Sequence, residues 1–255
     1  MSTRAHLLVQ ARSRFRRVVS AVGTRAGLSA LRHGVVSTLE PQPMLLRLRP
    51  SIVVDVGANR GQFALDVTKA VPRARIVAFE PLANEAAVFR KLFSTFHNVE
   101  LHQRALGAAP GKAQLHVAGA ADSSSLLRIG DLQEKLFPGT AEVEVVDVDV
   151  ETLDHALAEV DLSGASLLKI DVQGYELEVL RGGPLSLSQF RWVYVELSFV
   201  ELYKGQPLAH DGIAFLAAAS FVLVDTGIPS RVEGRTIQQD FLFERATVGD
   251  DVREK

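Results

Sequence analysis

Four carboxylates lie where four different buried strands of this chain are expected to end. They are Asp55, Glu80, Asp171 and Glu196. A parallel sheet needs none of these charges for its own stability, and the ligands of such sheets bind beyond the carboxyl ends of the strands. Carboxylates in that place can accept hydrogen bonds from a ligand, take up a proton or hold a hard cation. The four residues therefore outline a candidate binding or catalytic site.

The first carboxylate opens a glycine-containing turn, Asp55-Val-Gly-Ala-Asn-Arg-Gly61. Gly57 and Gly61 permit a tight turn, and the helix expected after it would offer free N–H groups to an anionic part of a ligand. A dinucleotide-binding turn has glycine where this chain has Asn59. The bulkier side chain favours a smaller ligand without a pyrophosphate, and Asp55 could accept hydrogen bonds from a ligand ammonium or from the loop itself. In the alternative, the turn serves only the geometry of the fold.

Glu80 lies about 20 residues beyond the glycine turn, where a carboxylate can hold both hydroxyls of a ribose. The two features together predict a ligand with an ammonium and a carboxylate near the turn and a ribose near Glu80. S-adenosylmethionine has these groups in that order.

Asp171 and Glu196 would converge if their strands are neighbours, because adjacent strands lie about 4.8 Å apart. Two carboxylates that close raise one pKa or require a cation. One could then act as a general base on a substrate hydroxyl, or both could ligate Mg²⁺. In the alternative, Glu196 only pairs with Lys169 or Arg191, and Lys169 contacts Asp171 on the same face of its strand.

Two further segments could take part in an acceptor site. His210 follows the strand that ends at Glu196 and could enter the acceptor pocket, although a lone histidine in a loop is more often a surface residue. The polar segment 118–140 is long enough to act as a lid or binding loop.

The pattern of apolar residues predicts strands that alternate with helices. The expected strands are 51–56, 75–79, 99–104, 113–117, 142–150, 166–171, 191–197, 221–225 and 239–245. Apolar spacings of three and four predict helices at 61–71, 82–96, 151–160, 175–181 and 208–219. This order implies βαβ units and a mostly parallel sheet.

The composition is that of an ordinary globular protein. Of the 255 residues, 47% are hydrophobic and 23% are charged, the formal net charge is −2, and there is no cysteine. No overall basic field favours nucleic acid, and disulfides, thiolate metal sites and cysteine nucleophiles are excluded. No apolar run is long enough to span a membrane as a helix. We expect a cytoplasmic protein.

The first 39 residues contain seven arginines and no acidic residue, with apolar residues between them at helical spacing. A basic amphipathic helix of this kind could pack on the main domain, dock peripherally on an anionic membrane surface or serve as a transit peptide. We divide the chain into a basic helical arm at 1–45, a main domain at 46–247 and a flexible tail at 248–255.

Several motifs follow one another over residues 50–245. They are the turn Asp55–Gly61, Phe79-Glu-Pro81, Ala105-Leu-Gly107 with Gly111, Thr152-Leu-Asp154, and Leu168-Lys-Ile-Asp-Val-Gln-Gly174 with Leu180-Arg-Gly-Gly183. In order and spacing they resemble the FkbM family of methyltransferases. The resemblance implies a class I methyltransferase fold, a three-layer α/β sandwich whose seven-stranded, mostly parallel sheet has an antiparallel last strand. It also implies S-adenosylmethionine-dependent O-methylation of a sugar, glycolipid or secondary metabolite.

The resemblance also implies roles for individual residues. The turn 57–61 would hold the methionine part of the cofactor, Glu80 the ribose and the region near Ala105 the adenine, while Asp171 would face the methionine ammonium or the acceptor. The predicted cofactor contacts are Asp55, Gly57, Ala58, Asn59, Gly61, Phe63, Glu80, Pro81, Ala105, Ser125 and Asp171. The predicted catalytic residues are Asp171, Glu196 and His210.

Three other classes of protein stay open at this point. A nicotinamide-dependent oxidoreductase is disfavoured by Asn59 and Asp55, and a noncatalytic membrane-associated module by the four strand-end carboxylates. A protein or nucleic-acid methyltransferase is disfavoured because no Asn-Pro-Pro-aromatic signature follows the fourth core strand.

Overall fold

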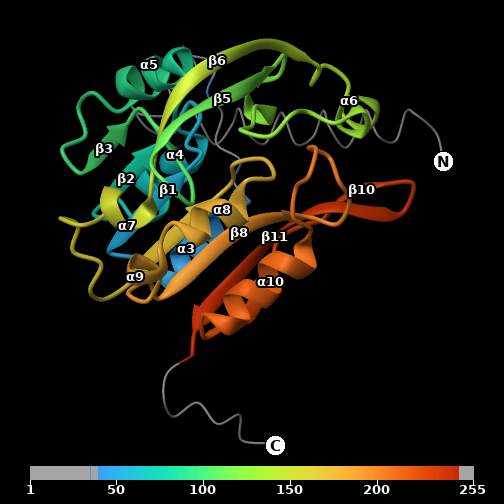
Figure 1. Cartoon of the computed structure of the whole chain (residues 1–255). Helices are drawn as coiled ribbons and strands as arrows, with labels where there is room; N and C mark the ends of the chain where they lie inside the picture. The colour runs from blue at the N-terminus through green and yellow to red at the C-terminus, as the bar shows by residue number, and fades with distance from the viewer. Residues whose placement is uncertain (1–34, 36–39, 247–255) are drawn as a thin grey trace, which may run out of the picture.

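The computed structural model describes residue 35 and residues 40–246, and its centre is a sheet of eight strands (Figure 1). The strands are β1 (Ile52–Val56), β2 (Arg75–Phe79), β3 (Val99–His102), β7 (Ser166–Ile170), β8 (Trp192–Ser198), β9 (Phe221–Thr226), β10 (Ser230–Val232) and β11 (Arg235–Arg245). The order across the sheet is β3-β2-β1-β7-β8-β11, and both β9 and β10 pair with the far side of β11. The first five strands of this order are parallel, and β11 is antiparallel to β8, β9 and β10.

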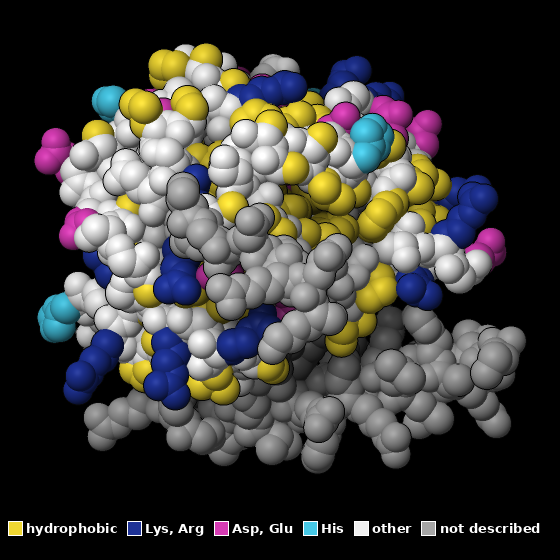
Figure 2. All heavy atoms as spheres, turned by 90° about the horizontal axis from the view of Figure 1, so that it is seen from below, with side chains coloured by type: hydrophobic (Ala, Val, Ile, Leu, Met, Phe, Trp, Pro, Cys, Tyr) yellow, Lys and Arg dark blue, Asp and Glu magenta, His cyan; other side chains and the backbone are white. Residues whose placement is uncertain are grey.

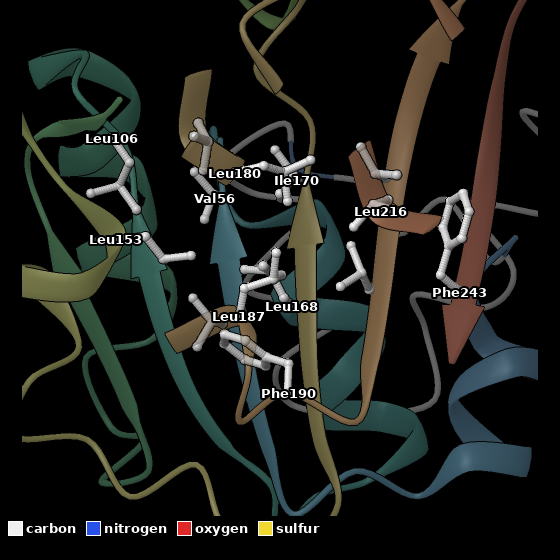
Figure 3. Packing of buried hydrophobic residues seen from close by; sticks show 14 of the residues in the cluster. Val56, Leu106, Leu153, Leu168, Ile170, Leu180, Leu187, Phe190, Leu216 and Phe243 are labelled. Atoms are coloured by element: carbon white, nitrogen blue, oxygen red, sulfur yellow. The ribbon is translucent and has the colours of Figure 1, made fainter. Parts of the chain in front are cut away.

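Helices cover both faces of the sheet, so the domain has three layers. One face is covered by α3 (Gln42–Leu48), α4 (Gln62–Ala70) and α5 (Ala83–Leu92). The other is covered by α7 (Leu153–Ala156), α8 (Glu176–Arg181), α9 (Pro184–Leu187) and α10 (Ala209–Ala218). Figure 3 shows the packing on this second face, where Val56 and Ile170 of the sheet lie beside Leu180 of α8, and Leu168 lies beside Leu187 of α9. The central strands are apolar on both sides because each face is buried.

A second, three-stranded sheet lies above the carboxyl ends of the main strands (Figure 1). It consists of β4 (Ala105–Leu106), β5 (Gly111–Ala118) and β6 (Glu142–Glu151), in the order β4-β6-β5. The segment between β5 and β6 contains a short 3₁₀ helix, η1 (Ala121–Ser123), and α6 (Asp131–Leu136). Alternation predicted strands at 113–117 and 142–150, and the structure places both in this separate sheet.

The predicted sheet is confirmed, with one addition. The order 3-2-1-7-8-11-9 has seven strands with antiparallel late strands, and β10 extends it by three residues that form a hairpin with β11. Helix α3 crosses the boundary that we placed at 45/46, and its Leu45 is fully buried in the core. Residues 1–34 and 36–39 of the arm and the tail at 248–255 lie outside the described residues, whereas Val35 of the arm is described and buried.

Length and hydrophobicity decide whether a helix of the described residues could span a membrane. Among residues 35 and 40–246, no helix has the length and apolar character needed to cross a bilayer. On the face shown in Figure 2, lysine and arginine side chains lie among apolar side chains rather than in one continuous basic patch.

Candidate functional site

A cavity of about 280 Å³ opens at the carboxyl ends of β1, β2, β7 and β8. This is the edge at which parallel α/β sheets bind their ligands. The second sheet and the β5–β6 segment contribute the opposite wall, through Leu115, Asp122 and Ser125 among others. The sequence predicted a lid or binding loop at segment 118–140, and its residues Asp122 and Ser125 do line the cavity.

The glycine turn brings the backbone of β1 against the end of β7. Gly57 has a φ of 78°, and a Cβ at this position would lie 1.8 Å from the Asp171 carbonyl oxygen. Asn59 also has a left-handed backbone, with a φ of 48°. At Gly61, with a φ of 93°, a Cβ would lie 2.5 Å from the Phe93 ring. A side chain at 57 would push the turn away from the end of β7 at the cavity, and a side chain at 61 would meet the core rings of Phe89 and Phe93, so both positions favour glycine.

Glu80 is buried beside this turn and holds it in place. Its Oε2 accepts a hydrogen bond from the Asn59 backbone N–H at 2.8 Å, and its Oε1 accepts one from the Leu82 N–H at 2.8 Å. Burial raises the pKa of Glu80 to about 7. The two backbone hydrogen bonds favour the charged form and lower the pKa, but burial has the larger effect. A ribose hydroxyl can use the lone pairs that these two bonds leave free.

Asp55 is completely buried and does not line the cavity. Its partner is Lys169, whose Nζ lies 3.0 Å from Asp55 Oδ1 and donates to the Gly57 carbonyl oxygen at 2.8 Å. Burial raises the pKa of Asp55, while Lys169 opposes that rise. Burial alone would lower the pKa of Lys169, but Asp55 and Asp171 outweigh burial and raise it. Of the two roles considered for Asp55, the geometry favours support of the loop.

Asp171 and Glu196 converge as the neighbouring strands predicted, and an amide lies between them. The Gln173 Nε2 donates to Asp171 Oδ1 at 2.7 Å and to Glu196 Oε2 at 3.2 Å. Gln238 on β11 donates to the same Glu196 oxygen at 3.2 Å. Among the described residues, no group of three or more His, Cys, Asp or Glu side chains could hold a metal ion, so the structure does not support the predicted Mg²⁺ site.

Glu196 lies near two other carboxylates, those of Asp171 and Asp240. Burial, followed by the charges of Asp171 and Asp240, raises the pKa of Glu196 well above its ordinary value. Burial also raises the pKa of Asp240 to about 6, although the Tyr194 hydroxyl donates to it. Lys169 is 3.8 Å from Asp171 Oδ2 and partly balances this negative charge.

The cavity gathers most of the residues selected from the sequence. The predicted site residues that line it are Gly57, Ala58, Asn59, Phe63, Glu80, Pro81, Ala105, Ser125, Asp171 and Glu196. Asp55 and Gly61, the two ends of the turn, do not line the cavity. His210 is not brought to the cavity: it lies in the first turn of α10, its side chain is 77% exposed, and its Nε2 is 3.3 Å from Asp211 Oδ1. The rotation of α10 directs this imidazole to solvent, so the structure gives it no contact with the other predicted residues.

Five cavity or network residues were not assigned a functional role from the sequence: Lys169, Gln173, Tyr194, Tyr203 and Asp240. Strand alternation already placed Lys169 on the same face as Asp171, and the same alternation could have found Tyr194, which shares a face with Glu196. Gln173 and Tyr203 come from loops, where no periodicity indicates direction.

The site suits S-adenosylmethionine. The turn at Gly57 has no side chain between the backbone and the end of β7, and the buried Glu80 lies at the end of the next strand. An α/β sheet of this order with such a site defines the class I methyltransferases. The sequence matches the family described as "Methyltransferase FkbM domain" over residues 55–223, and the chain belongs to this family. It is therefore a methyltransferase, and not the oxidoreductase or the binding module that the sequence left open. The family implies S-adenosylmethionine as the methyl donor.

Several known proteins are similar to this chain. The "2-O-methyltransferase NoeI" of Sinorhizobium fredii is 27% identical over 212 residues, which cover 78% of this chain and 82% of that protein. "Methyltransferase 1" of Beauveria bassiana is 32% identical over 168 residues, 60% of this chain and 64% of that protein, so the match spans less than two thirds of its length. A methyltransferase FkbM structure from Methylobacillus flagellatus has a TM-score of 0.47 at 13% identity, covering 76% of this chain and 44% of that one.

Proposed function

We propose that the protein transfers a methyl group from S-adenosylmethionine to a hydroxyl of a sugar, glycolipid or secondary metabolite. The observation that carries this proposal is the carboxylate pair Asp171 and Glu196, which lines the same cavity as the glycine turn and Glu80. A relative named as a 2-O-methyltransferase supports a hydroxyl as acceptor.

A hydroxyl needs help that an amine does not, because its oxygen is a weak nucleophile until its proton leaves. Bound S-adenosylmethionine supplies a methyl group that its sulfonium has already activated. The chain's own contribution is to orient the acceptor and to receive the proton. Orientation of two reactants in one cavity can supply several kcal/mol of the barrier.

In this proposal the carboxylate pair receives that proton. The Asp171 side chain is 40% exposed and lines the cavity, whereas Glu196 lies deeper, with its pKa raised by burial and by Asp171. The pair takes up one proton from the hydroxyl, and that proton relieves the repulsion between the two carboxylates. A positioned base of this kind contributes about 10²–10⁴-fold in rate.

Titration calorimetry with S-adenosylmethionine tests the cofactor site. We expect the Glu80→Gln variant to bind about tenfold or more weakly, because it loses the charge that attracts the ribose hydroxyls. Glu85→Gln is the matched control, since Glu85 is equally buried on the neighbouring helix but pairs with Arg60 and does not line the cavity. Equal binding by wild type and both variants would contradict this site.

Methyl transfer from labelled S-adenosylmethionine to free sugars, lipid-linked sugars, hydroxylated metabolites, peptides and RNA tests the acceptor. We expect transfer to a hydroxyl. Of the two roles considered for Asp171, the proposal takes the one toward the acceptor, so Asp171→Asn should lower kcat about 10²–10⁴-fold with a constant cofactor Kd, whereas a weakened Kd would assign Asp171 to the methionine ammonium. Transfer only to nitrogen of a peptide or nucleic acid would refute the proposal. Contact of the basic arm with an anionic membrane would give faster transfer to a lipid-linked acceptor in anionic vesicles than in neutral ones, which the same assay measures.

A further inference from the structure

Gln173 holds the two acidic side chains of the site together. An ionised carboxylate only accepts hydrogen bonds, whereas the amide nitrogen of glutamine has two hydrogens to donate. The Gln173 Nε2 lies 2.7 Å from Asp171 Oδ1 and 3.2 Å from Glu196 Oε2, so one hydrogen serves each carboxylate. The amide thereby fixes the separation of two groups that would otherwise repel each other.

Tyr203 determines which end of that amide faces the carboxylates. Its buried hydroxyl lies 2.9 Å from the Gln173 Oε1 and 3.0 Å from the Ser123 carbonyl oxygen. A hydroxyl hydrogen directed at Oε1 holds the oxygen away from the acidic pair and leaves the nitrogen facing it. The hydroxyl has a single hydrogen, and Gln173 Oε1 is the nearer of its two acceptors; the Ser123 carbonyl oxygen is the other, which places the β5–β6 segment of the opposite cavity wall beside this arrangement.

The backbone around Gln173 is held in an unusual conformation. Gln173 has a φ of 57° and Gly174 a φ of 96°. The buried Glu176 carboxylate accepts hydrogen bonds from the N–H groups of Val172 and Gly174, which keeps the turn closed. A left-handed non-glycine residue persists only where its surroundings determine it, and such residues gather at functional sites.

We propose that Gln173 is a positioning residue of the methyl transfer, which holds Asp171 and Glu196 as one proton-accepting unit, and that the Tyr203 hydroxyl acts through Gln173 by orienting its amide. The inference rests on the proposed function of the same carboxylate pair. Gln173 acts on the base and not on the glycine turn, so its loss should affect the chemical step and spare cofactor binding.

A double-mutant cycle on kcat tests this proposal. We expect Gln173→Leu to lower kcat at least tenfold with an unchanged cofactor Kd, and Tyr203→Phe to lower it less. The double variant should be no slower than Gln173→Leu, because Tyr203 acts through the amide that is already gone. Tyr175→Phe is the control: this tyrosine lines the same cavity from the start of α8, and its effect should multiply with that of Gln173→Leu. Multiplying effects of Tyr203→Phe and Gln173→Leu, or a loss of cofactor binding in Gln173→Leu, would overturn the proposal.

A second readout needs neither acceptor nor activity. The side-chain amide signal of Gln173 in an ¹H–¹⁵N spectrum is the one missing from Gln173→Leu. We expect this signal to move in Asp171→Asn and in Tyr203→Phe and to stay in place in Tyr175→Phe. An unresponsive signal would refute the hydrogen-bond arrangement itself. A responsive signal without hydroxyl methylation would refute only the proposed function, and the cycle is then measured on the reaction that the acceptor screen identifies.

Discussion

Lys169→Met removes the ammonium that lies 3.0 Å from the fully buried Asp55 carboxylate. Methionine replaces the apolar stem of lysine as far as Cε and lacks the ammonium, so the main change is the loss of the charge. Loss of one partner of a buried ion pair costs about 3–5 kcal/mol, because the other charge is left uncompensated. Domains are stable by only about 5–15 kcal/mol, so the variant should fold but unfold much more readily.

The cost should depend on pH in a defined direction. Burial already raises the pKa of Asp55, and Lys169 opposes that rise, so the variant raises it further. A carboxyl whose folded pKa exceeds its unfolded value loses stability as the pH rises from the unfolded pKa through the folded one. The deficit of Lys169→Met should therefore be larger at pH 8 than at pH 5.

Urea unfolding followed by fluorescence measures this, because the chain has a single tryptophan and Trp192 is only 4% exposed. We expect the midpoint at pH 8 to fall by about 1–2 M urea. Lys112→Met, which removes a lysine from an exposed pair with Asp149, should leave the midpoint unchanged. If Asp55→Asn fails to restore stability to Lys169→Met and the two changes simply add, the loss does not come from the uncompensated Asp55 charge.

Three further outcomes are expected. S-adenosylmethionine should bind more weakly as the pH falls below about 7. Burial raises the pKa of Glu80 to about 7, and the charged carboxylate is the better acceptor for ribose hydroxyls. Calorimetry at pH 6 and pH 8 measures this difference, and Glu80→Gln should remove the pH dependence. Gly57→Ala should destabilise the protein more than Gly139→Ala, because both positions have positive φ but only the Cβ at 57 meets the Asp171 carbonyl oxygen, at 1.8 Å, while that at 139 meets nothing within 4 Å; equal thermal shifts would contradict the close approach. EDTA should leave the methylation rate unchanged, because the Gln173 amide lies between Asp171 and Glu196, and a rate lost to EDTA and restored by Mg²⁺ would show otherwise.

The parts of the fold that depend on local pattern were predictable. The run 75–79 is β2 to the residue, and the other core strands were placed within a few residues, because strands buried on both faces are continuously apolar. Helix α3 was missed, since its seven residues lie among prolines that indicated a boundary. Pattern alone also could not show that β5 and β6 leave the main sheet, because alternation identifies a strand but not its partners.

The candidate site was predictable where strand ends determine it. Asp171 and Glu196 meet because β7 and β8 are neighbours, and Glu80 follows β2 beside the glycine turn. The contacts that organise these groups come from loops. Gln173 reaches both carboxylates through a left-handed turn, and Tyr203 approaches from a segment 30 residues further along the chain. Such contacts depend on the tertiary structure, which the spacing of residues along the sequence does not reveal.

The two backbone hydrogen bonds of Glu80 have a thermodynamic consequence. Both carboxylate oxygens are already tied, to the N–H groups of Asn59 and Leu82, so the side chain has one orientation before any ligand arrives. A free glutamate would lose rotational entropy on binding a ribose, a loss of about 0.5–1.5 kcal/mol for an immobilised side chain. Here that ordering is completed during folding, and the carboxylate presents its remaining lone pairs in a fixed direction, as a rigid receptor does.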